Sequence, residues 1–486
     1  MTQPGTESSN NDPPEAKLEA LLAGKRLPSL PHAIGCFSGV FLMISSGLFI
    51  FEISLHVIMF LALIWVVIQA SWLGHSFVIV RQMMNHGISK ALPALYIFLL
   101  IGMVIASYMQ SGTIASLLYY GIDWLNPVIF LPAGLILCCF MSLATGTSWG
   151  TVGTLGVVLM GIGETMGIPL PLVAGMIISG ATFGDKLSPI SDTTNLAAMS
   201  ADTRLYRHIH SMLYTTVPTF LIVLCLFIAF GFQFSDTVLP RTHIDEIRSA
   251  LSDAYRLSPW ITLLPLAAMF FLSIKRYAPE ISMSISVLLA ALIAILYQDR
   301  NSIDVLNALW LNTDGSTGID NLDALLGRGG IYSMAWTLLL SIMALALGGI
   351  LHHAGFLRVL LVNIIMHIKR ISTLIATTIT AGFISNIAMG EAYISIILNC
   401  QLFKSTYEEK AIDKAVLSRS VEEGATLTTA LIPWTTTGTF YAATLGIATL
   451  DYAPYALLNL LNPFVSIIMA LLGWGILRTA AKQINR

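Results

Sequence analysis

The sequence predicts an all-α polytopic membrane protein built from two inverted repeats, each with about five transmembrane helices, a re-entrant hairpin and a discontinuous helix. Three observations predict this class. The chain is 56% hydrophobic and only 11% charged, whereas soluble domains carry about 25% charged residues. Apolar runs of about 20 residues, the length that crosses a bilayer as a helix, recur along the chain. The second half of the sequence also repeats the first.

The charge composition excludes some classes of partner. A formal net charge of −2 with a mean hydropathy of +0.78 leaves no basic face for nucleic acid. The five cysteines lie within or at the ends of apolar runs and form no CxxC pair, which favours small buried side chains over disulfides or a metal site. We therefore expect a lipid bilayer as the surroundings, no nucleic-acid partner, and no cofactor beyond a transported ion.

The two halves align without a gap when one is shifted by 244 residues, the spacing between Gly180 and Gly424. The string GATFGDKLSPISDTTNLAAMSA at 180–201 then falls on GATLTTALIPWTTTGTFYAATL at 424–445. The Gly-Ala-Thr start, a leucine, a proline, a threonine and an alanine coincide. Weak internal repeats of this kind are typical of secondary transporters.

The repeat sets the expected order of elements. The polar N-terminal stretch lacks the basic head, apolar core and small-residue site of a signal peptide, which indicates a disordered cytosolic tail. We expect this tail at 1–28 and a first repeat at 29–232, with a hairpin near 127–163 and a broken helix near 170–198. A connecting loop at 233–257 follows. The second repeat is expected at 258–478, with a hairpin near 371–399 and a broken helix near 421–447, before a cytosolic tail at 479–486.

Orientation is predicted from where Lys and Arg collect beside the spans, because basic loops stay on the cytoplasmic side. Basic residues occur at Lys25 and Arg26, at several later loops including 404–419, and at the C-terminus. All these basic residues lie on a single side of the membrane only if each interrupted segment enters and leaves the membrane on one side, as a re-entrant hairpin does. The two halves are then inverted, both termini are cytoplasmic, and the expected location is the cell (inner) membrane.

Each half contains two breaks inside apolar segments. In the first half these are the string TGTSWGTVGTLG at 145–156 and the proline Pro189, which removes a backbone donor. The second half repeats them at 386–391 and at Pro433. Irregular backbone at membrane depth persists only where it is buried in protein or lines a wet cavity. Facing pairs of broken helices are how secondary transporters build an ion site at the midplane.

The side chains at these breaks offer oxygen atoms, which are the ligands that hard cations such as Na⁺ prefer. Asp185, Ser188 and Asp192 would share one face of a continuous helix at spacings of three and seven residues. Glu391 is the acid of the second hairpin and the repeat counterpart of Thr147. The candidate ion and proton ligands are Asp185, Ser188, Asp192, Thr193, Thr194, Thr147, Ser148, Glu391, Thr436 and Thr437, with Asp185, Asp192 and Ser188 as the sodium ligands.

An ionisable side chain at the bilayer centre costs at least ~2.5–3.5 kcal/mol, so such a residue indicates function. A buried carboxylate can hold a proton or a cation but not both well, and that competition coupled to alternating access gives antiport of Na⁺, or of Li⁺, against H⁺. Two structural readings remain open. Asp185 could merely neutralise Lys186 or cap a half-helix, and glycines such as Gly146 and Gly150 could serve close helix packing.

The strings GATFGDKLSPISDTTNLA, TGTSWGTVGTLG and ALIPWTTTGTFYAATLG resemble the NhaC family of sodium/proton antiporters in the ion transporter superfamily. The resemblance runs over nearly the whole chain from about residue 31. It implies inverted repeats with re-entrant hairpins, a homodimer with scaffold and moving parts that work as an elevator, and a prokaryotic cell membrane. The family's functional positions carry over to Asp185, Ser188, Asp192, Thr193 and Thr194. The second hairpin departs from a GDQY-like string, because this chain has GEAY at 390–393.

Two other functions remain as alternatives. The first is Na⁺- or H⁺-coupled exchange of an organic anion or amino acid, of the malate/lactate type. It needs a basic or amide anchor for a carboxylate, and only Lys186 and Asn195 qualify near the break. The second, more remote alternative is a membrane-embedded enzyme. A protease dyad needs two carboxylates on facing helices that share one proton, whereas Asp185 and Asp192 lie on one segment, and no HExxH or GxSxG string occurs.

Overall fold

The computed structural model describes residues 26–478, apart from 91, 122–126, 190, 235–240, 276, most of 314–328, and 366, 367 and 369. Within these residues the regular structure is helical, and the one β-type contact is an isolated bridge between Ile412 and Arg478. The predicted all-α class is therefore confirmed. Residues 1–25 and 479–486, which make up most of the two predicted tails, lie outside the described part of the chain.

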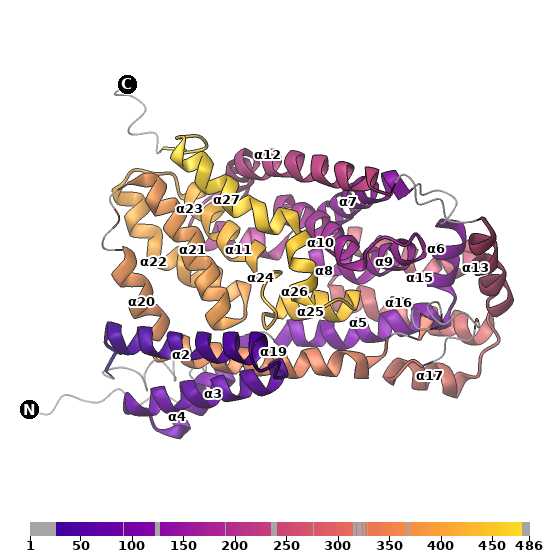
Figure 1. The fold of residues 1–486 in the computed structure, drawn as a ribbon, viewed down its shortest axis with the longest axis horizontal. Helices are drawn as coiled ribbons and strands as arrows, with labels where there is room; N and C mark the ends of the chain where they lie inside the picture. Colours follow the sequence, from indigo (N-terminus) through magenta and orange to yellow (C-terminus); the bar gives the residue numbers. More distant parts are fainter. Residues whose placement is uncertain are drawn as a thin grey trace, which may run out of the picture.

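The first half of the chain folds into long apolar helices with short helices between them (Figure 1). The long connection between the halves contains one of these elements, α13. The elements are α2 (Leu30–Phe49), α3 (Leu55–Trp72), α4 (Phe77–Lys90), α5 (Leu92–Gln110), α6 (Thr113–Gly121), α7 (Pro127–Thr145), α8 (Ser148–Thr151), the π-helical turn η1 (Val152–Gly156), α9 (Val157–Thr165), α10 (Leu170–Leu187), α11 (Asp192–Ser200), α12 (Leu205–Phe232) and α13 (Arg241–Ala254).

The second half follows a similar order. Its hairpin helices α21 and α22 match α7 and α8 in position, and α25 matches α11. The elements are α14 (Pro259–Thr262), α15 (Leu264–Ile274), α16 (Pro279–Leu296), α17 (Ser302–Trp310), α19 (Ile331–His353), α20 (Phe356–Ile365), α21 (Ile371–Met389), α22 (Ala392–Glu409), α23 (Lys414–Gly424), α24 (Thr426–Thr429), α25 (Thr436–Leu445), α26 (Thr449–Tyr452), the 3₁₀ turn η2 (Ala453–Tyr455) and α27 (Leu457–Leu471).

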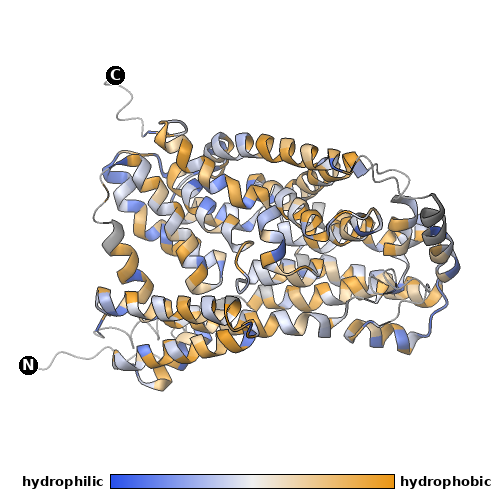
Figure 2. Ribbon diagram, viewed as in Figure 1, coloured by the Kyte–Doolittle hydropathy of each residue, from blue (hydrophilic) through white to orange (hydrophobic). Residues whose placement is uncertain are grey.

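The outer helices carry apolar side chains on their exposed faces. Among the described residues six helices are long and apolar enough to cross a membrane, and up to nine spans result if each of three bent helix pairs counts as one. Figure 2 shows hydrophobic residues predominating along α2, α3 and α12. Exposed examples are Phe41, Leu42, Phe60, Leu61, Leu221, Ile222, Leu288 and Leu292. Leaving such side chains in water costs about 1.5–3 kcal/mol each, so these faces meet lipid.

The short helices lie in the interior of the molecule. In Figure 1 the helices α8, α11, α24 and α25 lie between α12 on one side and α5 and α19 on the other. Two apolar clusters flank this region. One joins α5, α7, α9 and α10, and the other joins α2, α3 and α19 to the helices α21–α23. The apolar cores thus hold short, polar helix ends at the centre of the molecule.

The two hairpins break at equivalent positions. In the first, Gly146 adopts a left-handed φ of 71° and Thr147 caps α8; in the second, Gly390 has a φ of 67° and Glu391 caps α22. Both pairs are separated by 244 positions, the spacing of the sequence repeat. A left-handed residue favours glycine because other side chains clash there. The glycines therefore turn the chain, and the residue after each glycine satisfies the free N–H groups of the next helix.

The two broken helices are also equivalent. Pro189 separates α10 from α11, whose N-cap is Ser191, and Pro433 separates α24 from α25, whose N-cap is Thr435. A proline favours extended backbone at the residue before it, and Ser188 is extended with φ −77° and ψ 127°. Each break leaves backbone carbonyls at the end of one helix and N–H groups at the start of the next. Local chemistry alone therefore accounts for the position of both breaks.

The basic stretch 404–419 is not one exposed loop. It spans the end of α22 and the first part of α23, and Arg419 on α23 is only 1% exposed. Helix α23 packs against α21, α22 and α12, and Glu422 and Glu423 at its end are fully buried. The sequence shows a run of charges, but it does not show that residues from the first half neutralise them.

Close packing between α7 and α10 depends on glycine. A Cβ atom at Gly184 would lie 2.3 Å from the Cys139 carbonyl oxygen and 2.6 Å from the Leu143 nitrogen. These are backbone atoms that cannot move aside, so we expect Gly184→Ala to lower the free energy of unfolding by about 1–3 kcal/mol. Thermal unfolding in detergent measures this change. The control Gly35→Ala adds a Cβ with no atom within 4 Å and should be neutral or stabilising; equal effects of both would contradict the packing argument.

Candidate ion-binding site

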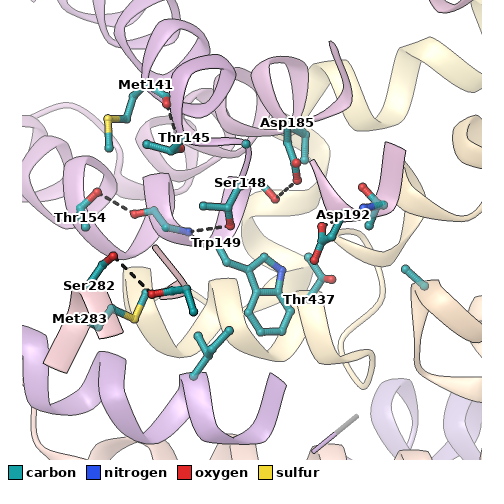
Figure 3. Close-up of a pocket in the computed structure, with 18 of the residues that line it drawn as sticks. Met141, Thr145, Ser148, Trp149, Thr154, Asp185, Asp192, Ser282, Met283 and Thr437 are labelled. Atoms are coloured by element: carbon teal, nitrogen blue, oxygen red, sulfur yellow. Dashed lines mark hydrogen bonds between the residues drawn. The ribbon is translucent and has the colours of Figure 1, made fainter. Parts of the chain in front are cut away.

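A cavity of about 850 Å³ lies where the broken elements meet. Its wall includes the first hairpin, the α10–α11 break, the start of α22 and residues of α24 and α25. Figure 3 shows Ser148, Asp185, Asp192 and Thr437 close to one another among the residues that line this cavity, with the Trp149 indole beside Thr437. Both halves of the chain therefore contribute to one central site.

Asp185 occupies the last turn of α10 and is 7% exposed. Its Oδ2 atom accepts a hydrogen bond of 2.6 Å from the Ser148 hydroxyl. Its Oδ1 atom has no hydrogen-bond donor among the described residues. A buried acceptor without a partner is costly, and Asp185 lines the cavity. The carboxylate therefore presents one open coordination position to a ligand in the cavity.

Asp192 is the first residue of α11 and lines the same cavity. Its Oδ1 atom accepts a hydrogen bond of 2.8 Å from the Thr193 backbone nitrogen, and its Oδ2 atom accepts one from the Tyr393 hydroxyl. A negative charge at a helix N-terminus is stabilised by the free N–H groups and the helix dipole. Asp192 is thus a carboxylate held in place by both halves of the chain.

Glu391 brings a third carboxylate to the cavity and is 2% exposed. It caps α22, its Oε2 atom accepts a hydrogen bond of 2.7 Å from the Thr436 hydroxyl, and the Thr436 backbone nitrogen donates to the Gly390 carbonyl at 2.9 Å. These contacts tie the second hairpin to the second broken helix. Glu391 occupies in the second half the place that Thr147 occupies in the first.

The predicted ligands divide into two groups. Those that line the cavity are Thr147, Ser148, Asp185, Asp192, Thr193, Glu391 and Thr437. The other three are buried and their hydroxyl groups bond within the protein. Ser188 donates to the Leu143 carbonyl at 2.9 Å, Thr436 donates to Glu391, and the Thr194 hydroxyl lies 3.1 Å from the Lys186 carbonyl oxygen. In this conformation the three hydroxyl groups stabilise the backbone and side chains at the helix breaks and do not form part of the cavity wall.

The prediction missed the aromatic part of the site. Tyr393 binds Asp192 and lines the cavity with Trp149 and Tyr441. The Trp149 ring stacks on Phe440 with ring centroids 4.5 Å apart. Tyr393 follows Glu391 by two residues, so its position beside the break of the second hairpin could have identified it as a candidate site residue. Nothing in the sequence indicates the Trp149–Phe440 stack, which joins residues 291 positions apart (440 − 149).

A second group, of which the sequence analysis considers only Lys186, lies outside the cavity wall. We call it the charge network; it comprises Lys186, His208, Arg419, Glu422 and Glu423, each at most 1% exposed. Glu423 lies 3.8 Å from the Lys186 ammonium and 3.9 Å from the Arg419 guanidinium, and Glu422 lies 2.8 Å from His208. The sequence feature that could have indicated this network is the acid pair Glu422 and Glu423, directly before the repeated Gly-Ala-Thr motif.

The charge of the cavity wall has one sign. Among the described lining residues the charged ones are Asp185, Asp192, Glu280 and Glu391, with no Lys, Arg or His. Lys186 faces Glu423 instead, and the Asn195 amide bonds to the carbonyls of Pro189 and Ser191. No group of three or more His, Cys, Asp and Glu with metal-binding geometry occurs in the described part. The wall therefore offers single carboxylates together with hydroxyl groups, a donor set that suits a monovalent hard cation.

The sequence matches the model of the Na⁺/H⁺ antiporter family over residues 19–194 and 180–474. The chain belongs to this family. The antiporter shares 34% identity over 448 residues with the malate-2H⁺/Na⁺-lactate antiporter of Bacillus subtilis, covering 92% of this chain and 94% of that one. It shares 34% identity over 437 residues with the Na⁺/H⁺ antiporter NhaC of Alkalihalophilus pseudofirmus, covering 89% and 94%.

A third relative of the antiporter, the arginine/ornithine antiporter ArcD of Halobacterium salinarum, is 32% identical over 454 residues, covering 93% of each chain. The relatives are named as transporters rather than enzymes, and the antiporter is a multi-pass membrane transporter of the same kind. The predicted family and the non-enzymatic function are confirmed. The relatives' names differ in substrate, so family membership alone leaves the transported solute open.

Proposed function

We propose that the antiporter exchanges Na⁺ for H⁺ across the cell membrane, with Asp185 and Asp192 binding the two ions in competition. The observation that carries this proposal is the open Oδ1 position of Asp185 in a cavity where both halves of the chain break. Li⁺ is a second candidate ion, because it is also a small hard cation.

The mechanism follows from the contacts of the three carboxylates. Ser148, Tyr393 and Thr436 each donate a hydrogen bond to a carboxylate, which holds the bonded oxygens in place. The cavity carries uncompensated negative charge, so it binds a positive ion from the side to which it opens. A proton and a Na⁺ ion neutralise the same carboxylate and exclude one another. Release on the opposite side then requires alternating access around the breaks.

The proposal also includes the arrangement of the protein in the membrane. The helix breaks separated by 244 positions support two structural repeats, and the asymmetry of basic residues supports their inversion with both termini in the cytoplasm. An elevator-type homodimer follows from the family resemblance. Cysteine accessibility on each side of closed vesicles tests the orientation, and cross-linking in the membrane tests the dimer.

Exchange of an organic anion or amino acid is the second candidate, because relatives are named as malate/lactate and arginine/ornithine antiporters. A carboxylate substrate needs a positive or amide anchor in the cavity. The two residues expected to supply it, Lys186 and Asn195, do not line the described wall. The negative cavity therefore favours an inorganic cation over an organic anion.

Purified antiporter in liposomes with an imposed pH gradient and an internal pH dye tests the function. We expect addition of Na⁺ to dissipate the gradient without any organic solute, and K⁺ or choline at equal ionic strength to serve as controls. A requirement for malate, lactate or an amino acid before any proton moves would overturn the Na⁺/H⁺ proposal in favour of organic exchange.

Competition for the same carboxylates predicts a pH dependence. As the pH rises, protons leave the carboxylates and Na⁺ meets less competition, so the Na⁺ concentration for half-maximal exchange should fall by up to about tenfold per pH unit in the titrating range. Rates measured over a series of Na⁺ concentrations at several pH values give this quantity. A half-maximal concentration that stays constant with pH, while the maximal rate changes, would argue against a shared site.

A further inference from the structure

The charge network contains a histidine that the proposed exchange does not use. His208 on α12 is fully buried and lies outside the cavity wall. Its Nε2 atom lies 2.8 Å from Glu422 Oε2, and its Nδ1 atom lies 2.7 Å from the Ser418 hydroxyl oxygen. Both ring nitrogens therefore have partners on α23.

These partners accommodate both protonation states of His208. In the neutral ring, Nε2–H donates to Glu422 and Nδ1 accepts from the Ser418 hydroxyl. In the protonated ring both N–H groups donate, and the Ser418 hydroxyl turns towards the Ala415 carbonyl, which lies 3.2 Å away. The change requires only the rotation of one hydroxyl group. A proton can thus enter and leave this buried position without breaking the surrounding packing.

The charges around His208 come from several elements. Helix α23 supplies Lys414, Arg419, Glu422 and Glu423, α10 supplies Asp185 and Lys186, and α11 supplies Asp192. Helix α12 itself carries His210 and Arg207, and Arg207 pairs with Asp413; α7 and α27 carry no Asp, Glu, Lys, Arg or His. Lys186 and Arg419 balance Glu422 and Glu423 while His208 is neutral. A proton on His208 adds one positive charge to the charge network, outside the cavity wall.

A direct connection links His208 to the break. Glu422 binds His208 through Oε2, and its Oε1 atom lies 3.2 Å from the Thr194 hydroxyl. Thr194 lies in the first turn of α11 and also contacts the carbonyls of Asp185 and Lys186. Only Glu422 and Thr194 separate His208 from the segment that carries both sodium carboxylates. Because His208 is buried and connected to this segment through Glu422 and Thr194, we expect a proton on His208 and a Na⁺ ion in the cavity to repel one another.

We propose that His208, held by Glu422 and Ser418, is a second proton-binding site of the antiporter. Binding of Na⁺ in the cavity expels this proton in addition to one from the cavity carboxylates, so more than one H⁺ exchanges for each Na⁺. This inference rests on the proposed Na⁺/H⁺ exchange and adds a separate position for one of the protons.

The test counts protons released when Na⁺ binds to the purified protein in weakly buffered detergent solution between pH 6 and 9, with bound Na⁺ measured by a radioactive tracer. We expect the wild type to release more than one H⁺ per Na⁺ at its maximum, and His208→Gln to release about one fewer while it still binds Na⁺. The control His210→Gln changes an exposed histidine on the same helix and should match the wild type.

The outcomes separate the two proposals. If the wild type neither releases protons on Na⁺ binding nor exchanges the ions in liposomes, the proposed function fails. If it does both and His208→Gln releases as many protons as the wild type, the second site is refuted alone. Where His208→Gln does not fold, Ser418→Ala replaces it: loss of the acceptor for the protonated ring should move proton release to lower pH, and an unchanged pH profile would refute the site.

Discussion

Asp192→Asn is expected to abolish Na⁺-dependent proton movement in liposomes. The amide oxygen can still accept the hydrogen bond from the Thr193 nitrogen, and the amide NH₂ group, in place of Oδ2, can donate to the Tyr393 hydroxyl oxygen. The fold should therefore persist while one negative charge of the cavity is lost. Changes to the supporting partners of metal ligands cost about 10–100-fold in affinity. Removal of a charged ligand should therefore reduce the exchange rate at fixed Na⁺ by more than about 100-fold.

The matched control is Asp202→Asn, ten residues further along (202 − 192). Asp202 is exposed after α11 and pairs with Lys404 and Lys414, whose proximity lowers the pKa of its carboxyl group. It adopts a left-handed φ of 58°, which asparagine tolerates. This variant should exchange at the wild-type rate. Wild-type exchange by Asp192→Asn, or equal loss in both variants, would remove Asp192 from the ion site.

Glu423→Gln is expected to produce the largest loss of stability among single substitutions in the charge network. The Glu423 carboxylate lies between Lys186 and Arg419 and accepts a hydrogen bond from Thr215. Its neutralisation leaves two buried cations opposite one remaining acid. Removal of one partner from a buried ionic group costs about 3–5 kcal/mol, so the thermal unfolding temperature in detergent should fall clearly.

Two controls separate the charge effect from a general effect of the substitution. The double variant Lys186→Met with Glu423→Gln removes one charge of each sign and should recover part of the lost stability. Glu408→Gln changes an acid whose side chain is 49% exposed and pairs with Lys414 at 3.2 Å, and should cost less than about 1 kcal/mol. A drop for Glu423→Gln no larger than that for Glu408→Gln would mean that the network contributes no net stability.

Much of the fold could be predicted because local chemistry determines it. The absence of enough charged residues to cover a water-facing surface predicts a membrane protein, and the length of the apolar runs predicts helices. Pro189, Pro433, Gly146 and Gly390 break the chain by their own backbone restrictions. These are properties of single residues and their neighbours, so one sequence is sufficient to place them.

The site could be predicted only in part. Asp185, Asp192 and Glu391 were expected because acids inside apolar segments are rare and costly, and all three line the cavity. The orientation of the hydroxyl groups was not predictable. Ser188 and Thr194 stand in the same string as Asp185, yet they bond to Leu143 and to the carbonyls of the break. Whether a hydroxyl faces the ion or the backbone depends on which partner lies closer in the folded chain.

The sequence by itself determined the helical membrane class, the repeat of 244 residues, the four breaks and the acids beside them. Only the tertiary structure decided which groups form hydrogen bonds or ion pairs with the buried acids. Tyr393 contacts Asp192 although they are 201 positions apart in the sequence, and Glu422 contacts His208 at a separation of 214 positions. The tertiary structure also decided that the charges of α23 are buried. A charge is stable in the interior only when opposite charges and hydrogen-bond partners surround it, and here those partners come from the other half of the chain.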